Sequence, residues 1–404
     1  MEQYDVVIAG GGPAGLALAA PLATAGFAVL VCERNAEIGV PVRTSGGSWP
    51  DDLRRLGLPD HLWHPIHRLS FRSRTQACTI DWGGPTGCSL DVTAAWRYLA
   101  AEAERAGATV ATGTLARLER TGRLSLRTGD DQRSVSCRLA VDATGTNALL
   151  ARQSGVHEGF RRVGVGYERE LSAPAFGQEE AMVIVGGVAP AGYAWAFPRG
   201  GTRVRVGVGL IQPDTDVNPR TMYEPVERLL ADRLAGAEVL ELHSGRIPSE
   251  EAPERLTGDG LMVVGDAGGQ SNPLLGEGIR HVIQAAHRAA PIAIAALSRQ
   301  GVVPVERLRA WERTGRRVRG TSWGLAMRAN RYVARMDDDD WDRAVELLGR
   351  LPVEVATPML RGDILDPRML SAALRTGPSM AWRVLRPFAL GGVARGGAPG
   401  ISPQ

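Results

Sequence analysis

The sequence predicts an α/β fold class: a doubly wound parallel sheet, an antiparallel β-sheet inserted into it, and a C-terminal helical region. Three observations lead to this expectation. A short β-branched run at residues 4–9 passes through a glycine-rich turn into an Ala- and Leu-rich segment, as in a βα unit. Residues 163–211 change to alternating β segments. An apolar run at residues 261–264 then restores the first pattern, so the parallel-sheet lobe is predicted to be discontinuous in sequence.

The composition excludes several classes of function. The chain has 404 residues and a formal net charge of only +3, which gives no reason to expect a nucleic acid partner. All 47 basic residues are arginine, so no mechanism that needs a side-chain amine is available. The four cysteines lack CxxC spacing and a nearby histidine cluster. The acidic run at residues 337–340 points in several directions on any regular element, so we predict no metal site.

The hydropathy pattern predicts a cytoplasmic protein. The N-terminal end enters a strand at once, without the charged and apolar regions of a signal peptide. No apolar run reaches the length of about 18 residues that a membrane-spanning helix needs. Weak contact with a membrane surface is left open.

Glycines at a fixed spacing follow the first predicted strand. Gly10, Gly12 and Gly15 form the pattern GxGxxG, which permits a tight turn, close approach of the main chain to a pyrophosphate and close helix packing. The N-terminal end of the following helix adds a partial positive charge. Glu33 ends the second predicted strand at the distance at which a carboxylate binds the ribose hydroxyls. The segment therefore predicts a dinucleotide without a 2′-phosphate.

A second glycine-rich segment, residues 265–278, follows the apolar run at 261–264 and opens another predicted helix. Asp266 at the strand end can accept hydrogen bonds from ribityl hydroxyls, and the new helix can face the N1/C2=O edge of a flavin. A site for NAD alone does not need this second half, so the two segments together predict FAD. The residues predicted to bind it are Gly10, Gly12, Pro13, Ala14, Gly15, Glu33, Arg34, Arg43, Thr44, Gly145, Gly265, Asp266, Pro273, Gly276, Glu277, Gly278 and Ile279.

These patterns divide the chain into regions. The FAD-binding domain is predicted to comprise residues 1–70, 90–155 and 255–300. A substrate-binding β-sheet domain is predicted from residues 71–89 and 156–254, and a C-terminal helical region from residues 301–390. The remaining residues 391–404 are rich in Gly and Pro and are expected to form a flexible tail.

The glycine-rich motifs and the strand end at residues 141–145 resemble, in this order, the p-hydroxybenzoate-hydroxylase-type flavoprotein superfamily. Residues 190–198, PAGYAWAFP, resemble the PxxYxWxFP signature of its geranylgeranyl reductase family, and residues 265–279 resemble that family's flavin-binding stretch. The resemblance spans nearly the whole chain. It implies a Rossmann-like FAD-binding domain with a sheet that forms the roof over the flavin.

Two positions depart from the family pattern. Geranylgeranyl reductases commonly carry a cysteine in the loop that corresponds to residues 38–48, where this chain has Thr44 and Ser45. Thr93 stands where many relatives have an arginine that contacts the flavin. These departures weigh against the standard prenyl-reductase activity and leave FAD binding unaffected.

The aromatic signature also has a physical interpretation. Tyr193, Trp195 and Phe197 alternate with Ala194 and Ala196, so the three rings lie on one face of a strand. Such a stripe is usually a face packed into a core. Because this sheet lies over the flavin in the family that the chain resembles, we predict that the three rings line a substrate pocket.

Several activities remain open at this stage. The leading hypothesis is reduction of a C=C bond in an apolar isoprenoid- or polyketide-like substrate by hydride transfer from flavin N5, with Tyr193 and Ser45 as the catalytic candidates. The alternatives are an FAD-dependent monooxygenase on a similar substrate and a redox-neutral cyclase or isomerase. A halogenase is rejected, because such relatives carry a catalytic lysine. Only one dinucleotide fingerprint is present, so NAD(P)H binding transiently or a reduced protein carrier is expected to donate the electrons.

Overall fold

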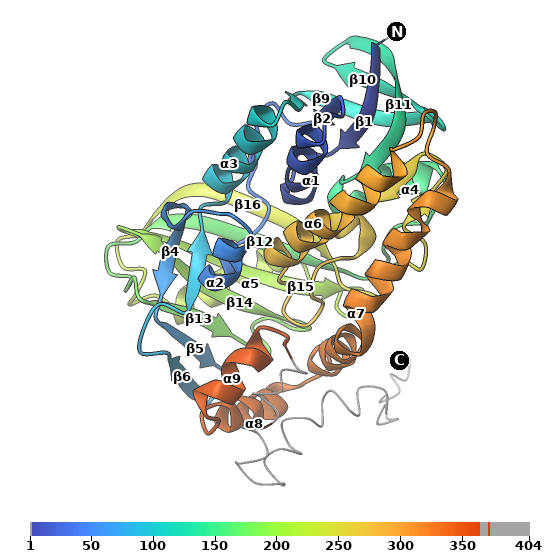
Figure 1. Ribbon diagram of the computed structural model, residues 1–404. Helices are drawn as coiled ribbons and strands as arrows, with labels where there is room; N and C mark the ends of the chain where they lie inside the picture. Colours follow the sequence, from blue (N-terminus) through green and yellow to red (C-terminus); the bar gives the residue numbers. More distant parts are fainter. Residues whose placement is uncertain (1, 364–370, 372–404) are drawn as a thin grey trace, which may run out of the picture.

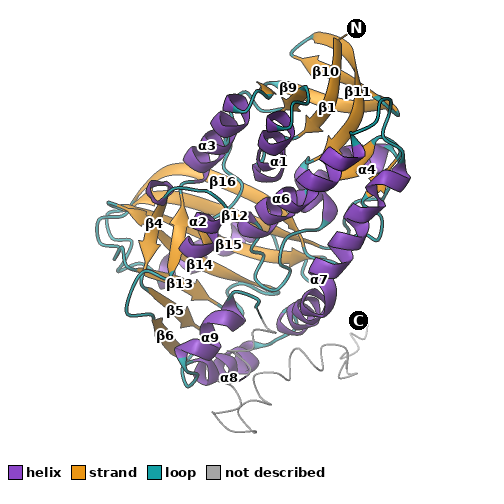
Figure 2. Ribbon diagram, in the orientation of Figure 1, coloured by secondary structure: helices purple, strands orange, loops and turns teal. Residues whose placement is uncertain are grey.

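The computed structural model describes residues 2–363 and residue 371. Within them, the chain forms a parallel sheet flanked by helices, a second sheet of mixed direction and a set of C-terminal helices, so the predicted fold class is confirmed (Figure 1). Figure 2 shows the strands gathered in two separate groups, with helices between and beside them. The part of the predicted helical region beyond residue 363 and the predicted tail lie outside the described residues, apart from residue 371.

The parallel sheet forms the core of the first lobe. Its strand order is β17-β18-β11-β1-β2-β8, and β9 and β10 extend β11 as an antiparallel hairpin. Residues Val6, Val7 and Ile8 of its central strand are all fully buried, because helices cover both faces. The strands are β1 (Glu2–Ala9), β2 (Val29–Cys32), β8 (Thr109–Ala111), β9 (Thr114–Arg120), β10 (Arg123–Thr128), β11 (Asp131–Asp142), β17 (Thr257–Gly258) and β18 (Leu261–Val263).

Helices follow the strand ends of this lobe at the predicted places. The first begins with Pro13, whose missing N–H is unneeded in the first turn, and its Ala and Leu side chains pack into the core. The long helix predicted at about residues 278–298 forms at Ile279–Ala296 and packs against the helix that begins at Pro13. The helices and 3-10 turns of the lobe are α1 (Pro13–Thr24), α2 (Pro50–Arg55), α3 (Val92–Arg105), α4 (Leu149–Gln153), α6 (Ile279–Ala296), η1 (Asp60–Leu62), η2 (Gly145–Asn147) and η3 (Gly265–Gly268).

The second sheet, called the mixed sheet below, has the strand order β16-β12-β15-β14-β13-β5-β6. Its neighbours are antiparallel, as predicted, except for the parallel pair of β5 and β13. Helix α5 (Pro219–Leu229) covers the outer face with an apolar layer. The strands are β5 (Arg68–Arg72), β6 (Ala77–Asp81), β12 (Val163–Ser172), β13 (Glu180–Ile184), β14 (Gly192–Gly200), β15 (Arg203–Gln212) and β16 (Glu238–Pro248); β3 (Gly47–Ser48), β4 (Trp63–Ile66) and β7 (Gly87–Leu90) form a small separate sheet.

The C-terminal helices connect the two lobes. Helix α7 (Val305–Val333) runs from the parallel sheet to the end of the mixed sheet, where α8 (Asp338–Leu348) and α9 (Val353–Leu360) pack against β6 (Figure 1). The acidic run at residues 337–340 begins α8: the Asp337 carboxylate caps it by accepting from the N–H of Asp340. Asp339 also pairs with Arg74 of the β5–β6 turn at 2.6 Å. No described helix is long and apolar enough to cross a membrane.

Candidate functional site

A cavity of about 2600 Å³ lies between the parallel sheet, the mixed sheet and the C-terminal helices. Ligand pockets usually measure about 300–1000 Å³, so this volume suits a large cofactor together with a second large molecule. Most residues predicted from the sequence line it, although they come from distant parts of the chain. These are Gly10, Gly12, Pro13, Ala14, Glu33, Arg34, Arg43, Thr44, Ser45, Gly145, Tyr193, Trp195, Asp266, Pro273, Gly276, Gly278 and Ile279.

The glycine-rich turn between β1 and α1 has the geometry that a dinucleotide requires. A Cβ atom on Gly15 would lie 2.2 Å from the carbonyl oxygen of Gly10, so this glycine is needed where the helix packs on the strand and does not itself line the cavity. A Cβ on Gly12 would meet no atom within 4 Å, because this position opens into the cavity at the N-terminal end of α1. The open cradle fits a pyrophosphate.

Glu33 holds this turn as well as facing the cavity. Its Oε2 accepts from the N–H of Gly11 at 2.8 Å, and its Oε1 accepts from the N–H of Asn35 at 2.9 Å. Each carboxylate oxygen keeps a second lone pair, which can accept from a ribose hydroxyl. The predicted role of Glu33 therefore stays a prediction with suitable geometry.

The second half-site lies at the end of β18. Burial raises the pKa of Asp266, although its carboxylate accepts from the hydroxyl of Ser271. Gly265 and Glu277, also predicted to bind FAD, do not line the cavity. Gly265 packs against Ala14. Burial alone would raise the pKa of Glu277, but its pairing with His281 and Arg280 outweighs burial and lowers it.

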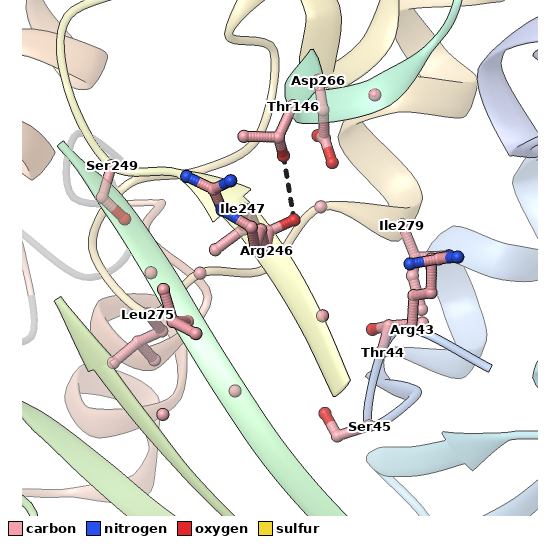
Figure 3. Close-up of a pocket in the computed structure, with 18 of the residues that line it drawn as sticks. Arg43, Thr44, Ser45, Thr146, Arg246, Ile247, Ser249, Asp266, Leu275 and Ile279 are labelled. Carbon is pink, nitrogen blue, oxygen red and sulfur yellow. Dashed lines mark hydrogen bonds between the residues drawn. The ribbon is translucent and has the colours of Figure 1, made fainter. Parts of the chain in front are cut away.

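The loop at residues 38–48 forms another wall. Figure 3 shows Arg43, Thr44 and Ser45 on one side of the cavity and Leu275 on the opposite side. A buried arginine of β15, Arg205, donates from Nη1 to the carbonyl oxygen of Ser45 at 3.0 Å. The hydroxyl of Thr93, which stands where relatives carry an arginine, donates to the carbonyl oxygen of Gly39 at 3.1 Å and so ties α3 to this loop.

The aromatic stripe of β14 divides between the cavity and the small separate sheet. Tyr193 and Trp195 line the cavity, whereas Ala194 and Ala196 are fully buried in the apolar layer on the other face, as the alternation predicts. Phe197 was predicted to line the pocket and does not: its ring packs over Gly47 of β3, where a Cβ would lie 2.9 Å from it. The loop that carries β3 thus covers this ring.

Glycines opposite the stripe make room for the indole of Trp195. A Cβ on Gly207 of β15 would lie 2.4 Å from the ring, and Gly209 and Gly166 also face it. The hydroxyl of Tyr193 donates to the carbonyl oxygen of Leu275 at 2.5 Å, and burial raises its pKa to about 12. Tyr193 therefore stays neutral and connects the mixed sheet to the glycine-rich segment of the parallel lobe.

The far end of the cavity has an apolar wall that was not predicted from the sequence, beside charged lining residues such as Arg343 and Glu346 of α8. Helices α8 and α9 close it against β5 and β13, and this closure depends on packing between segments distant in the chain. The apolar side chains there are Phe71, Val183, Val185, Trp341, Val345, Leu348, Leu351, Met359 and Leu360. Such a lining suits a long hydrocarbon chain.

Charged side chains of the mixed sheet were also missed. Glu168 and His243 line the cavity and are 3% and 5% exposed. A signal was present, because Glu168 and Glu170 alternate along a predicted strand, but it does not say which face they occupy. Glu170, Glu241 and His243 have side-chain donor atoms within 4.8 Å of one another, but Arg203 already pairs with both carboxylates and Arg205 with Glu170.

Comparisons with known proteins agree with this geometry. A family model described as an FAD binding domain matches residues 3–319. The digeranylgeranylglycerophospholipid reductase 2 of Methanothermobacter thermautotrophicus is 30% identical over 374 residues, which cover 86% of this chain and 92% of that protein. The digeranylgeranylglycerophospholipid reductase of Methanothrix thermoacetophila is 29% identical over 398 residues, 95% and 98% of the two chains.

Solved structures show the same fold. A geranylgeranyl bacteriochlorophyll reductase-like protein from Thermoplasma acidophilum has a TM-score of 0.83 at 22% identity, covering 96% of this chain and 100% of that one. A p-nitrophenol 4-monooxygenase from Pseudomonas putida has a TM-score of 0.67 at 17% identity, covering 89% and 98%.

The fold and the glycine-rich half-sites define an FAD-dependent oxidoreductase, with the residues of the cavity fitting that cofactor. More particularly, the chain belongs to the geranylgeranyl reductase family of these enzymes, as the aromatic signature predicts.

Proposed function

We propose that this enzyme reduces a C=C bond in a small apolar molecule with an isoprenoid- or polyketide-like chain. One observation carries the proposal: the cavity continues from the glycine-rich turn at Gly12, past Trp195, to an apolar end at Leu348 and Met359. Such continuity would let a hydrocarbon chain reach the flavin ring. The relatives named as digeranylgeranylglycerophospholipid reductases support a substrate with isoprenoid chains.

Each part of the cavity has a proposed role. Gly12 and the N-terminal end of α1 hold the pyrophosphate, Glu33 the ribose and Asp266 the ribityl chain. Bound FAD in its reduced form supplies the hydride. Tyr193 and Trp195 position the substrate, and the apolar end excludes water, so that the reacting carbon stays dry. Tyr193 and Ser45 remain the catalytic candidates predicted from the sequence.

The electron donor belongs to the same proposal. One dinucleotide fingerprint is present, and it is assigned to FAD, so we infer that NAD(P)H visits transiently or that a reduced protein carrier delivers the electrons.

The test begins with the purified holoenzyme. The enzyme is photoreduced without oxygen and then mixed with a lipid that carries geranylgeranyl chains. We expect the flavin to be oxidised and the lipid to gain one H2 per reduced bond, as measured by mass spectrometry. Transfer of an oxygen atom when O2 is admitted would instead support the monooxygenase, which the absence of a cysteine at Thr44 and Ser45 favours. A product isomeric with the substrate, formed without net loss of reductant, would support the cyclase or isomerase.

A variant pair tests the apolar end. Met359→Arg places a charge in the cavity wall, and we expect the KM for the lipid to rise by about tenfold or more, because an apolar chain would then lie against a buried charge. Val353→Arg makes the same change on the same helix, at a residue that is 37% exposed and does not line the cavity, and should leave KM unchanged. Equal effects of the two substitutions would contradict the proposed path of the substrate.

A further inference from the structure

A row of hydrogen-bonded polar side chains crosses the mixed sheet from the cavity to the protein surface. At its inner end lies Glu168 of β12, which lines the cavity. Its Oε2 accepts from the indole Nε1 of Trp195 at 2.6 Å. Its Oε1 lies 2.9 Å from Nδ1 of His243, a residue of the neighbouring strand β16. Both oxygens of this buried carboxylate thus have a defined partner.

His243 continues the row outward. Its Nε2 lies 3.0 Å from Oε2 of Glu241, whose side chain is 51% exposed. Because both ring nitrogens face carboxylate oxygens, only the doubly protonated imidazolium can donate to both. Burial by itself would lower the pKa of His243, but the hydrogen bonds to Glu168 and Glu241 outweigh burial and raise it. The two hydrogen bonds and the raised pKa therefore favour a protonated imidazole between solvent and the cavity.

Other charged groups face this row from the neighbouring strands. On β15, Arg205 Nε lies 3.7 Å from Glu168 and 2.9 Å from Glu170, and Arg203 lies 3.7 Å from Glu241 and 2.5 Å from Glu170. The two arginines offset the carboxylates, and the Coulombic effect of Arg205 lowers the pKa of His243 against the hydrogen bonds. The arginines therefore balance the charge of these carboxylates while His243 keeps its hydrogen bonds to Glu168 and Glu241.

We propose that Glu241, His243 and Glu168 form a proton relay that carries a proton from solvent to the substrate in the cavity. The inference rests on the proposed alkene reduction, which adds one hydride and one proton across the double bond. The hydride and its two electrons would come to one carbon of that bond from reduced FAD held at Gly12, Glu33 and Asp266. Nδ1 of His243 passes its proton to Glu168, and Glu168 passes a proton on to the other carbon as the hydride arrives. The imidazole then regains a proton from water by way of Glu241.

The alternative donors fit this task less well. The hydroxyl of Tyr193 is engaged with the carbonyl oxygen of Leu275, and burial raises its pKa to about 12. Ser45 has a hydroxyl with a far higher intrinsic pKa than a carboxyl group. Glu168 has a hydrogen-bonded connection to a half-exposed carboxylate, so it can be recharged while the cavity stays dry.

Glu168→Gln is the decisive variant, because the amide oxygen can still accept from Trp195 but the group cannot carry the proton. We expect the oxidation of pre-reduced holoenzyme by the lipid to slow by about 10²–10⁴-fold, as general acid catalysis contributes. The wild-type rate should fall as pH rises through the pKa of His243 and should be slower in D2O, whereas the variant should lose both dependences. Glu227→Gln is the control, because Glu227 faces Arg169 from α5 outside the cavity and should behave as wild type.

A second readout needs no substrate. In enzyme labelled with 13C-histidine, the resonance that His243→Gln removes should titrate above the usual range of histidine, and Glu168→Gln should lower its pKa. Thermal unfolding and FAD content show whether each variant is folded. Wild-type rate and pH profile in Glu168→Gln would overturn the relay, as would a His243 pKa that Glu168→Gln leaves unchanged. A wild-type enzyme that reduces no alkene would refute the proposed function, while the titration would still decide the coupling on which the relay depends.

Discussion

The parallel lobe and the mixed sheet build their shares of the cavity from different parts of the chain. In the parallel lobe the cavity is lined by turns at strand ends, such as the main chain at Gly10 and Gly12, while the strand side chains are buried and apolar. In the mixed sheet the lining comes from side chains in the middle of strands, including Glu168, Trp195 and His243. The first region can bind a cofactor through its backbone; the second can supply acid, base and shape.

This difference explains why the cavity-lining residues of the parallel lobe could be predicted from the sequence and those of the mixed sheet could not. A turn that approaches a pyrophosphate needs glycine at a local, fixed spacing. A side chain in a strand reaches the cavity only if the pairing register and the face are right, and a shift of one residue would turn it away. Both faces of the mixed sheet carry alternating patterns, so the pattern alone does not identify the face that lines the cavity.

The largest expected effect follows from loss of a buried ion pair in the mixed sheet. Arg205→Met leaves Glu170 buried without its buried hydrogen-bonded partner, and we expect the free energy of unfolding to fall by about 3–5 kcal/mol. Arg203→Met removes a 44% exposed partner of the same carboxylate and should cost no more than about 1 kcal/mol. Urea unfolding of the two holoproteins gives the comparison; equal losses would show that burial of Arg205 is not what matters.

An intermediate effect distinguishes folding stability from FAD affinity in the glycine-rich turn of the parallel lobe. Gly15→Ala forces a Cβ to within 2.2 Å of the Gly10 carbonyl oxygen and should destabilise the protein by about 1–3 kcal/mol. Gly12 has a φ of −84°, and a Cβ added to it would meet no atom within 4 Å. Gly12→Ala should therefore change the free energy of unfolding by less than about 0.5 kcal/mol, while the Kd for FAD rises by about tenfold. Calorimetric unfolding and flavin fluorescence measure the two quantities separately. Loss of stability without loss of FAD affinity in Gly12→Ala would contradict the assignment of this turn.

The smallest expected effect is a pH dependence of stability that arises in the mixed sheet. The pKa of His243 is raised in the folded protein, so its contribution is fully present below the unfolded pKa of about 6.5 and is lost as pH rises through the folded pKa. Compared with His243→Gln, the wild type should therefore gain stability towards acid pH.

His157 provides the matched control with the opposite sign. Burial lowers its pKa, so its contribution is present above the unfolded value and is lost as pH falls through the folded pKa. Urea midpoints between pH 5 and 9 (about the range in which histidine titrates) measure both variants. The same slope difference for His157→Gln and His243→Gln would refute the assigned charge states.

Local chemistry in the sequence determined the fold class, the FAD-dependent oxidoreductase class and the family. The GxGxxG turn, the segment at 265–278 and the aromatic signature are short motifs whose residues act within one turn or strand. They can therefore be interpreted from the sequence without knowledge of the tertiary structure. The individual residues predicted to bind FAD stay predictions, although most line one cavity.

Tertiary structure decided the rest. It placed Phe197 against Gly47 and not in the pocket, and it brought α8 and α9 over the end of the mixed sheet to close an apolar cavity. It also aligned Glu168, Trp195 and His243, from three strands, on one hydrogen-bonded path. The physical reason is common to all three outcomes: each depends on contacts between residues far apart in the chain, and such contacts follow from register and packing rather than from local spacing.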